Sequence, residues 1–299
     1  MDGSREPVTA AATARPADSE GSIAAGMIYG VSTYLCIEGR VTTSWLEDAR
    51  RAGAEIVELF CARQSFDYRD PGRVSELARW FRDSTLRLHS LHAPVYSDTE
   101  RGRSGPHTTV NLADVERIWR RDSVDEIKRS LEVAETLPFR YLVQHAGVKG
   151  ESYDERKVEA LFRSIEELNV FAHDRGVEIL IENTPNELST ATRLAEFVEQ
   201  THLENGFCLD TGHAHLAETV ESAFGILRDR IRSTHIHDND GSEDQHLRPG
   251  AGGAIPWPRG MELLRSRGQQ YPLVLELRSS EAEKPDCAIG RAIEFLEGQ

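Results

Sequence analysis

Six apolar segments of this chain each end in a side chain that can bind a metal ion or move a proton. These side chains are His92, His145, Glu182, Asp210, His235 and Glu276. Others of the same kind follow closely in the adjoining segments, namely His213, Asp244 and His246. Polar groups are costly at the ends of buried strands unless they share a partner. The pattern therefore predicts one shared polar site, at the end of a parallel barrel where the carboxyl ends of the strands meet.

The donor types in this set predict a divalent metal ion. Glu182 and Glu276 end otherwise apolar strands, and either carboxylate would be costly to bury without a cation or a hydrogen-bond donor. A metal ion shared between them meets that need. Imidazoles and carboxylates without cysteine favour Mn²⁺, Zn²⁺, Co²⁺ or Fe²⁺ over Ca²⁺ and leave Mg²⁺ open. Glu58 ends an apolar run in the same way, and we expect it to contact a metal ligand or the substrate.

The segment around Asp210 brings a carboxylate and an imidazole together. Asp210 and His213 lie three residues apart across an expected strand-to-helix turn, and Gly212 would allow a turn sharp enough for both to face one centre. The plainer alternative is an aspartate that caps the helix beside an exposed histidine.

The segment around His235 carries a second imidazole. His235 and His237 share one face of a strand because their spacing is two. We expect His237 to be packed and hydrogen-bonded to Asp238, and we take a solvated acidic turn as the alternative for Asp244 and His246.

Strand and helix patterns alternate along the chain from residue 27 onward. We expect strands at 27–32, 55–60, 86–91, 140–145, 177–182, 206–210, 232–237 and 273–277. We expect helices at 43–52, 74–81, 114–137, 154–173, 190–201, 218–229, 257–266 and 286–296. Eight such units predict an α/β protein with a single-domain (β/α)8 TIM barrel over residues 27–299. A doubly wound sheet is disfavoured, because no GxGxxG follows the first strand.

Segments between and before these elements have their own signals. Gly176, Gly206 and Gly268 precede expected strands and are typical of the residue after a helix C-cap. The long loop 95–111 is expected to be either a lid over the site or a surface loop without such a role. Residues 1–26 lack the apolar region of a signal peptide, and we expect a disordered N-terminal tail.

Composition limits the partners of the protein. The formal net charge is −15, which disfavours binding to nucleic acid or to an anionic membrane surface. No segment approaches the roughly 18 apolar residues of a membrane span. The cysteines show no CxxC spacing, which favours reduced thiols in a cytoplasmic protein. Lys149 and Arg248 fall in loops at the expected site and could hold a substrate phosphate or carboxylate, although solvated loop cations are the simpler interpretation.

An ordered set of motifs resembles the xylose isomerase-like TIM barrels. The motifs are Leu91–His92–Ala93–Pro94, Gln144–His145–Ala146–Gly147, Ile181–Glu182–Asn183–Thr184, Leu209–Asp210–Thr211–Gly212–His213, His235–Ile236–His237–Asp238, Asp244–Gln245–His246 and Leu275–Glu276. That superfamily contains isomerases and epimerases of sugars and sugar phosphates, related dehydratases, and AP endonucleases of the endonuclease IV type. The resemblance runs from about residue 27 to residue 296 and implies an enzyme of carbohydrate metabolism.

The resemblance to the sugar epimerases implies a mononuclear metal site. The matching ligands are Glu182, Asp210, His235 and Glu276. In that mode Glu182 and Glu276 would also be the catalytic pair, one removing a proton next to a carbonyl and the other returning it on the opposite face. His92, His145 and His213 would bind the sugar or a water molecule.

Two related chemistries remain open beside the epimerase. Ketose 3-epimerases carry an arginine soon after the strand-seven histidine, whereas this chain has no arginine there before Arg248, so a dehydratase or lyase with the same first step is an alternative. The endonuclease IV type holds three zinc ions, and all of its ligand types have counterparts here. These counterparts are His92, His145, Glu182, Asp210, His213, His235, Asp244, His246 and Glu276.

We favour the sugar enzyme over the nuclease on three observations. The net charge of −15 opposes DNA binding. No loop combines arginine with a bulky wedge residue. The segments at Thr184–Pro185–Asn186 and Gly212 differ from those of the nucleases. A non-catalytic barrel that binds metal or sugar ranks last, because Glu182 and Glu276 are both present. The sequence leaves open which sugar is bound, which metal, and whether the chain forms a homo-oligomer.

Overall fold

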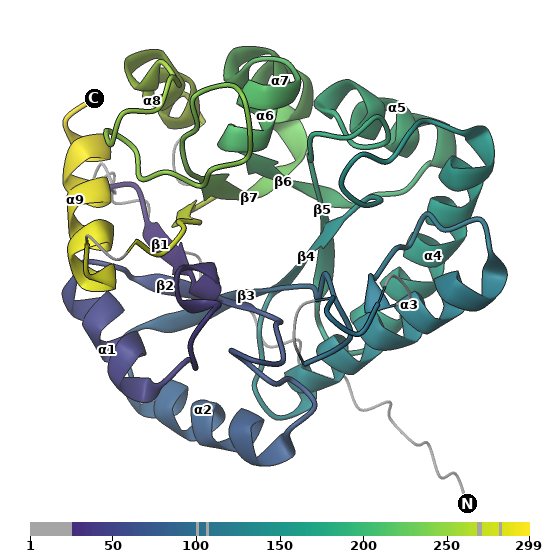
Figure 1. Cartoon of the computed structure of the whole chain (residues 1–299), viewed down its shortest axis with the longest axis horizontal. Helices are drawn as coiled ribbons and strands as arrows, with labels where there is room; N and C mark the ends of the chain where they lie inside the picture. The colour runs from purple at the N-terminus through teal and green to yellow at the C-terminus, as the bar shows by residue number, and fades with distance from the viewer. Residues whose placement is uncertain (1–25, 100–101, 106–107, 268–270, 281–282) are drawn as a thin grey trace, which may run out of the picture.

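A computed structural model describes residues 26–99, 102–105, 108–267, 271–280 and 283–299, and the expected tail 1–26 lies almost wholly outside these ranges. The chain forms a closed barrel of parallel strands surrounded by helices (Figure 1). The strands are β1 (Tyr29–Ser32), β2 (Ile56–Phe60), β3 (Arg87–His92), β4 (Tyr141–His145), β5 (Glu178–Glu182), β6 (Gly206–Asp210), β7 (Ile231–Ile236) and β8 (Leu273–Leu275).

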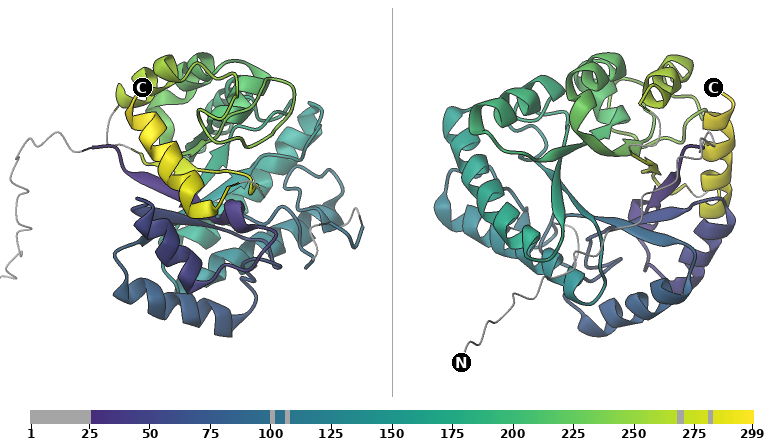
Figure 2. Two further views of the ribbon diagram at one scale, coloured as in Figure 1. Left: turned by 60° about the vertical axis from the view of Figure 1, so that its left-hand side comes forward. Right: turned by 180° about the vertical axis from the view of Figure 1, so that it is seen from behind.

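The helices form an outer layer that encloses the barrel, as both faces show (Figures 1 and 2). They are α1 (Thr43–Arg51), α2 (Pro71–Asp83), α3 (Arg117–Leu131), α4 (Glu155–His173), α5 (Ala191–Thr201), α6 (Thr211–Ala217), α7 (Val220–Leu227), α8 (Trp257–Arg265) and α9 (Pro285–Glu297). None of the helices in the described ranges combines the length and apolarity needed to span a bilayer.

Barrel closure confirms the predicted (β/α)8 fold. Each strand pairs in parallel with the next along the chain, and β1 pairs with β8 through Gly30 opposite Val274. Most strand residues are buried on both faces, as the apolar composition predicts, and the main exception is the start of β3 at Arg87. Several helices begin at a side chain that accepts from backbone N–H groups of the first turn, as Asp70 does for α2 and Asp154 for α4.

Some expected boundaries are wrong. The predicted helix 114–137 is α3 followed by a short 3-10 helix at Glu132–Glu135. The predicted helix 218–229 is α7. The turn expected at Asp210 leads into a separate short helix, α6, for which no range was predicted.

The glycines predicted to follow helix C-caps differ in outcome. Gly176 has φ +70°, as a residue after a helix C-cap requires. Gly206 instead begins β6, and the preceding helix ends at His202 with φ +58°. Gly268 lies outside the described residues.

Candidate metal centre and active site

Strand alternation positions the polar groups at one end of the barrel. Val143, Leu180 and Cys208 form part of a buried cluster on β4, β5 and β6. His145, Glu182 and Asp210 each follow one of these residues by two positions, so they lie on the same face of their strands, at the carboxyl end. The same alternation relates Val274 to Glu276 at the end of β8.

The carboxylates and imidazoles at this end converge. A central group consists of Glu182, Asp210, His235 and Glu276, each offering a donor atom within 4.8 Å of the others. Nδ1 of His235 lies 3.3 Å from Oε1 of Glu182, 3.7 Å from Oδ2 of Asp210 and 3.5 Å from Oε2 of Glu276. These four residues are at most 2% exposed.

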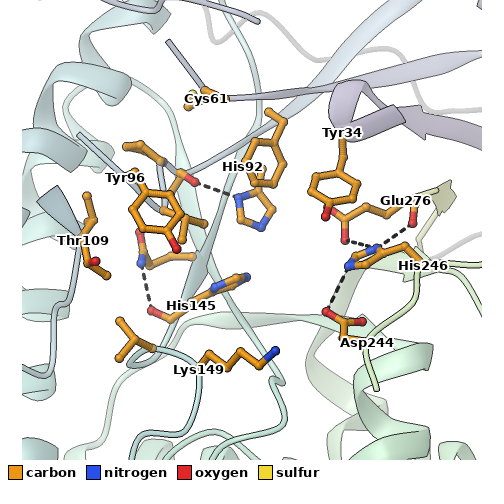
Figure 3. A pocket seen from close by; sticks show the side chains of 18 of the residues that line it. Tyr34, Cys61, His92, Tyr96, Thr109, His145, Lys149, Asp244, His246 and Glu276 are labelled. Atoms are coloured by element: carbon orange, nitrogen blue, oxygen red, sulfur yellow. Dashed lines mark hydrogen bonds and ion pairs between the residues drawn. The ribbon is translucent and has the colours of Figure 1, made fainter. Parts of the chain in front are cut away.

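Two further groups of donors flank the central group. In the first, Nε2 of His92 and Nε2 of His145 lie 3.3 Å and 3.2 Å from Oε2 of Glu182. In the second, Nε2 of His213 and Nε2 of His246 lie 3.2 Å and 3.1 Å from Oδ2 of Asp244. We call these the His92 group and the Asp244 group. The structure thus brings together every residue that the sequence assigned to the site. Figure 3 shows the members that reach the pocket and are labelled there, namely His92, His145, Asp244, His246 and Glu276.

Hydrogen bonds to carbonyl oxygens orient the flanking imidazoles. A carbonyl oxygen only accepts, so Nδ1 of His92 donates to Ala93 at 2.8 Å and Nδ1 of His246 donates to the carbonyl of Glu276 at 2.9 Å. The Nε2 lone pairs of both rings therefore face the carboxylates, as metal ligation requires.

His235 has the opposite orientation. Its Nε2 lies 3.0 Å from Oε1 of Glu58, and the other oxygen of Glu58 accepts from Ser90 at 2.8 Å. Its Nδ1 faces the central group and makes no hydrogen bond there among the described residues. Glu58 contacts a candidate ligand, which is one of the two roles expected for it.

His237 is where the sequence interpretation was wrong. Its Nε2 lies 3.0 Å from Oδ2 of Asp210 and not beside Asp238. Alternation places His237 on the inward face with His235, whereas Asp238 accepts from Nε1 of Trp257 at 2.7 Å. His237 also belongs to the Asp244 group, which the sequence analysis missed although the spacing of two from His235 signalled it.

Gly212 has a different role from the one expected. No left-handed φ occurs there, and a Cβ atom at this position would lie 2.0 Å from Cε1 of His237. The glycine therefore makes room for the His237 ring. Asp210 caps α6 through the N–H of His213 and also faces His213 Nδ1 at 3.6 Å. The capping role is therefore present together with the site role, whereas the exposed histidine of the alternative is wrong because His213 is buried.

Electrostatics show that the site needs positive charge. Burial opposes ionisation of Glu182, but His235 and His145 outweigh it and hold the pKa of Glu182 well below its ordinary value. Burial raises the pKa of Glu276, and His235 offsets it only in part. Burial disfavours protonated His213, yet Asp210 and Asp244 raise its pKa well above 6.5. Without a metal ion, protons on imidazoles supply the charge that these carboxylates require.

The donor set fits a divalent metal ion. Both oxygens of Glu182 and Oε1 of Glu276 are buried and make no hydrogen bond among the described residues. Leaving such oxygens unpaired is costly, so a cation is their natural partner. The mixture of imidazole and carboxylate donors suits Zn²⁺, Mn²⁺, Co²⁺ or Fe²⁺.

A pocket of about 490 Å³ opens above these groups, and that volume suits a small molecule. Phe60 stacks on His92 with ring centroids 4.2 Å apart, and Tyr34 packs on His246 at 4.6 Å. Tyr96, from the long loop after β3, also lines the pocket, while closure of that loop as a lid stays a prediction.

The two loop cations considered from the sequence differ in position. Lys149 lines the pocket and is exposed. Arg248 does not line it, because its guanidinium binds Glu283 at 3.1 Å.

Comparison with known proteins decides the family. Residues 46–299 match the family model described as xylose isomerase-like TIM barrel. The chain belongs to this family. The predicted resemblance is therefore confirmed over most of the barrel.

Relatives of this xylose isomerase-like barrel differ in their described activities. It is 35% identical over 229 residues to "Uncharacterized protein MJ1614" of Methanocaldococcus jannaschii, covering 76% of this chain and 83% of that protein. It is 26% identical to fructoselysine 3-epimerase of Escherichia coli O157:H7, covering 58% and 66%. It is also 26% identical to "Probable endonuclease 4" of Thermotoga maritima, covering 48% and 57%.

Solved structures agree with this xylose isomerase-like fold. A D-tagatose 3-epimerase-like protein superposes with a TM-score of 0.72 and 26% identity, covering 91% of this chain and 97% of that chain. The IOLI protein, solved with a zinc atom bound, has a TM-score of 0.67 and 21% identity, covering 91% and 96%, which supports the fold alone.

Proposed function

We propose that this chain is a divalent-metal-dependent isomerase or epimerase of a sugar or sugar phosphate. The observation that carries the proposal is the central group, in which the buried carboxylates of Glu182 and Glu276 share one donor set with Asp210 and His235. The similarity to fructoselysine 3-epimerase and to the D-tagatose 3-epimerase-like structure supports a sugar substrate.

The geometry suits proton transfer next to a carbonyl group. Glu182, Asp210, His235 and Glu276 would hold the divalent ion. The ion would supply Lewis-acid polarisation of a substrate carbonyl, which lowers the pKa of the neighbouring C–H. Glu182 and Glu276 come from β5 and β8, so they approach from different sides of the barrel mouth. One carboxylate removes the proton, and the other returns a proton to the opposite face. His92, His145 and His213 bind substrate hydroxyls or a water molecule.

The test is deuterium exchange from solvent into a panel of ketoses and ketose phosphates. Two single variants, Glu182→Gln and Glu276→Gln, each replace one carboxylate with an amide. We expect the exchange rate to fall about 100-fold or more in each, because an amide accepts no proton. Glu178→Gln is the matched control, since Glu178 lies at the other end of β5. Exchange that survives in both variants would eliminate the two-carboxylate mechanism.

A phosphodiesterase of the endonuclease IV type is the second candidate. The observation that favours it is that candidate metal ligands extend beyond the central group. They form four sets, of which three share members, and these sets also include His92, His145, His213, Asp244 and His246. The net charge of −15 opposes it, because DNA binding relies on cations that neutralise phosphates. Cleavage of a duplex with a single abasic site, at low salt with zinc, would place this activity first. A dehydratase or lyase would show exchange together with loss of water or cleavage of the sugar.

A further inference from the structure

We propose that Lys149 and Arg278 bind the phosphate group of a phosphorylated sugar at the mouth of the pocket. The inference rests on the proposed function, because it names the substrate class of the same site. Both residues line the pocket above the donor groups. In Figure 3 the Lys149 side chain extends across the opening toward the side that carries Asp244. We refer to Lys149 and Arg278 as the rim cations.

Each rim cation follows a residue of the metal centre closely in the sequence. Lys149 follows His145 by four residues, in a turn flanked by Gly147 at φ +91° and Gly150 at φ +74°. Arg278 follows Glu276 by two residues, and its N–H donates to the carbonyl of His246 at 2.9 Å. These cations extend from β4 and β8, which lie on opposite sides of the closed barrel. A group at the centre of the mouth is therefore approached from both sides.

The charges of the rim cations are available to a ligand. Both side chains are exposed, and neither forms an ion pair or a side-chain hydrogen bond within the described ranges. Arg63 lines the same pocket but is engaged, with Nε 3.3 Å from Asp67 and Nη1 3.4 Å from the carbonyl of Ser97.

The carboxylates of the pocket face partners other than the rim cations. Asp98 accepts from the N–H groups of Gly102 at 2.7 Å and Ser104 at 3.0 Å. Asp244 and Glu276 face the imidazoles of the metal centre, His246 among them. The rim cations therefore do not serve to neutralise a neighbouring acid of the described chain.

The chemistry of two unneutralised cations favours a phosphate over a sugar hydroxyl or a carboxylate. A hydroxyl needs only neutral hydrogen-bond partners. A phosphate monoester carries more charge than a carboxylate, and its oxygens point in several directions, so an ammonium and a guanidinium can bind it from opposite sides. Such local charge attracts an anion even though the whole chain has a net charge of −15.

The test measures binding to the metal-loaded protein by isothermal titration. The ligands are D-fructose, D-fructose 6-phosphate, inorganic phosphate and a ketose that bears a carboxylate at the same carbon. We expect the 6-phosphate to bind about tenfold or more tightly than the neutral sugar, as charge-assisted hydrogen bonds would give. In Lys149→Gln/Arg278→Gln this advantage disappears while binding of fructose is unchanged. Arg248→Gln, the matched control outside the pocket, keeps it.

Two results would overturn the inference. Phosphate or sugar phosphate that binds the double variant as tightly as the parent is held elsewhere, for example by the metal ion itself. The second result is a carboxylate-bearing ketose whose affinity rises more through the rim cations than that of the sugar phosphate does. That result would exclude phosphate as the preferred group. Turnover is not needed for this readout. If rim-cation-dependent binding is found without any deuterium exchange, the phosphate site stands and the proposed isomerase function fails.

Discussion

The orientation of His235 is the residue-scale feature on which the central group depends. Its Nδ1 can face Glu182, Asp210 and Glu276 only because its Nε2 is held by Glu58, which is itself fully buried. Burial opposes the charge of Glu58, yet His235 outweighs it and lowers the pKa of Glu58 to about 2. An ionised Glu58 accepts a hydrogen bond from the Nε2–H of His235. The Nδ1 lone pair of His235 is then left for a metal ion.

Glu58→Ala should therefore weaken metal binding, although it leaves every carboxylate of the central group in place. We expect the affinity for the divalent ion to fall about 10- to 100-fold, the usual effect of losing a partner of this kind. Glu58→Gln should lose less, because its amide oxygen still accepts from Nε2. Competition with a chelating dye measures the affinity. Glu55→Ala is the control, because Glu55 is exposed and lies immediately before β2. A folded Glu58→Ala protein with parental affinity would show that Glu58 does not position His235.

Residue types and strand ends could predict the donors but not their orientation. Six of the donors follow an apolar run, so burial of that run predicted their place, and His213, Asp244 and His246 were predicted from the adjoining segments. The pairing of Glu58 with His235 joins residues 177 positions apart, and no local pattern contains that contact. The same limit explains why His237 was assigned to its sequence neighbour Asp238 and not to Asp210.

At the scale of elements, α6 packs against β7 through a contact between Gly212 and His237. A Cβ on Gly212 would overlap the His237 ring, with 2.0 Å to Cε1 and 2.4 Å to Nδ1. That ring is fully buried and stacked on His246 at 4.0 Å, so it has little room to move. The helix and the strand thus hold Asp210 and His237 together.

Gly212→Ala should lower the free energy of unfolding by about 1–3 kcal/mol, the usual cost of an overpacked core. Gly225→Ala is the control, because a Cβ there meets nothing within 4 Å and α7 should gain about 0.5–1 kcal/mol from alanine. Urea denaturation measures both. In a His237→Ala background the cost of Gly212→Ala should shrink, and an unchanged cost would contradict the proposed contact.

Helices and strands were predictable where the hydrophobic repeat extended over a long enough segment. Each strand, and each helix of more than eight residues except α3, was predicted within a few positions, because buried strands and amphipathic helices have distinct repeats. The helix predicted at 114–137 ends as α3 at Leu131 and continues as a short 3-10 helix. The helix α6 was missed because it spans only Thr211–Ala217, starts directly from the cap at Asp210 and is buried over most of its length. A segment that short and that buried has no amphipathic pattern to detect.

At the scale of the whole molecule, barrel closure converts separate strand ends into one site. Parallel strands in sequential order carry all of their carboxyl ends to the same mouth, so donors spread from His92 to Glu276 become neighbours. The sequence could predict this convergence once the number of strands was recognised. It could not predict how the donors would be grouped, since His92, Glu182, His235 and Glu276 each belong to more than one candidate set of ligands.

Metal content of the purified native protein tests this account most directly. Elemental analysis should find about one or more tightly bound divalent ions per chain, because buried carboxylates with unpaired oxygens need a cation. About one ion per chain agrees with the isomerase proposal, and about three zinc ions would favour the hydrolytic alternative. A folded chain that holds no divalent ion, and takes up none when Mn²⁺ or Zn²⁺ is supplied, would contradict the account.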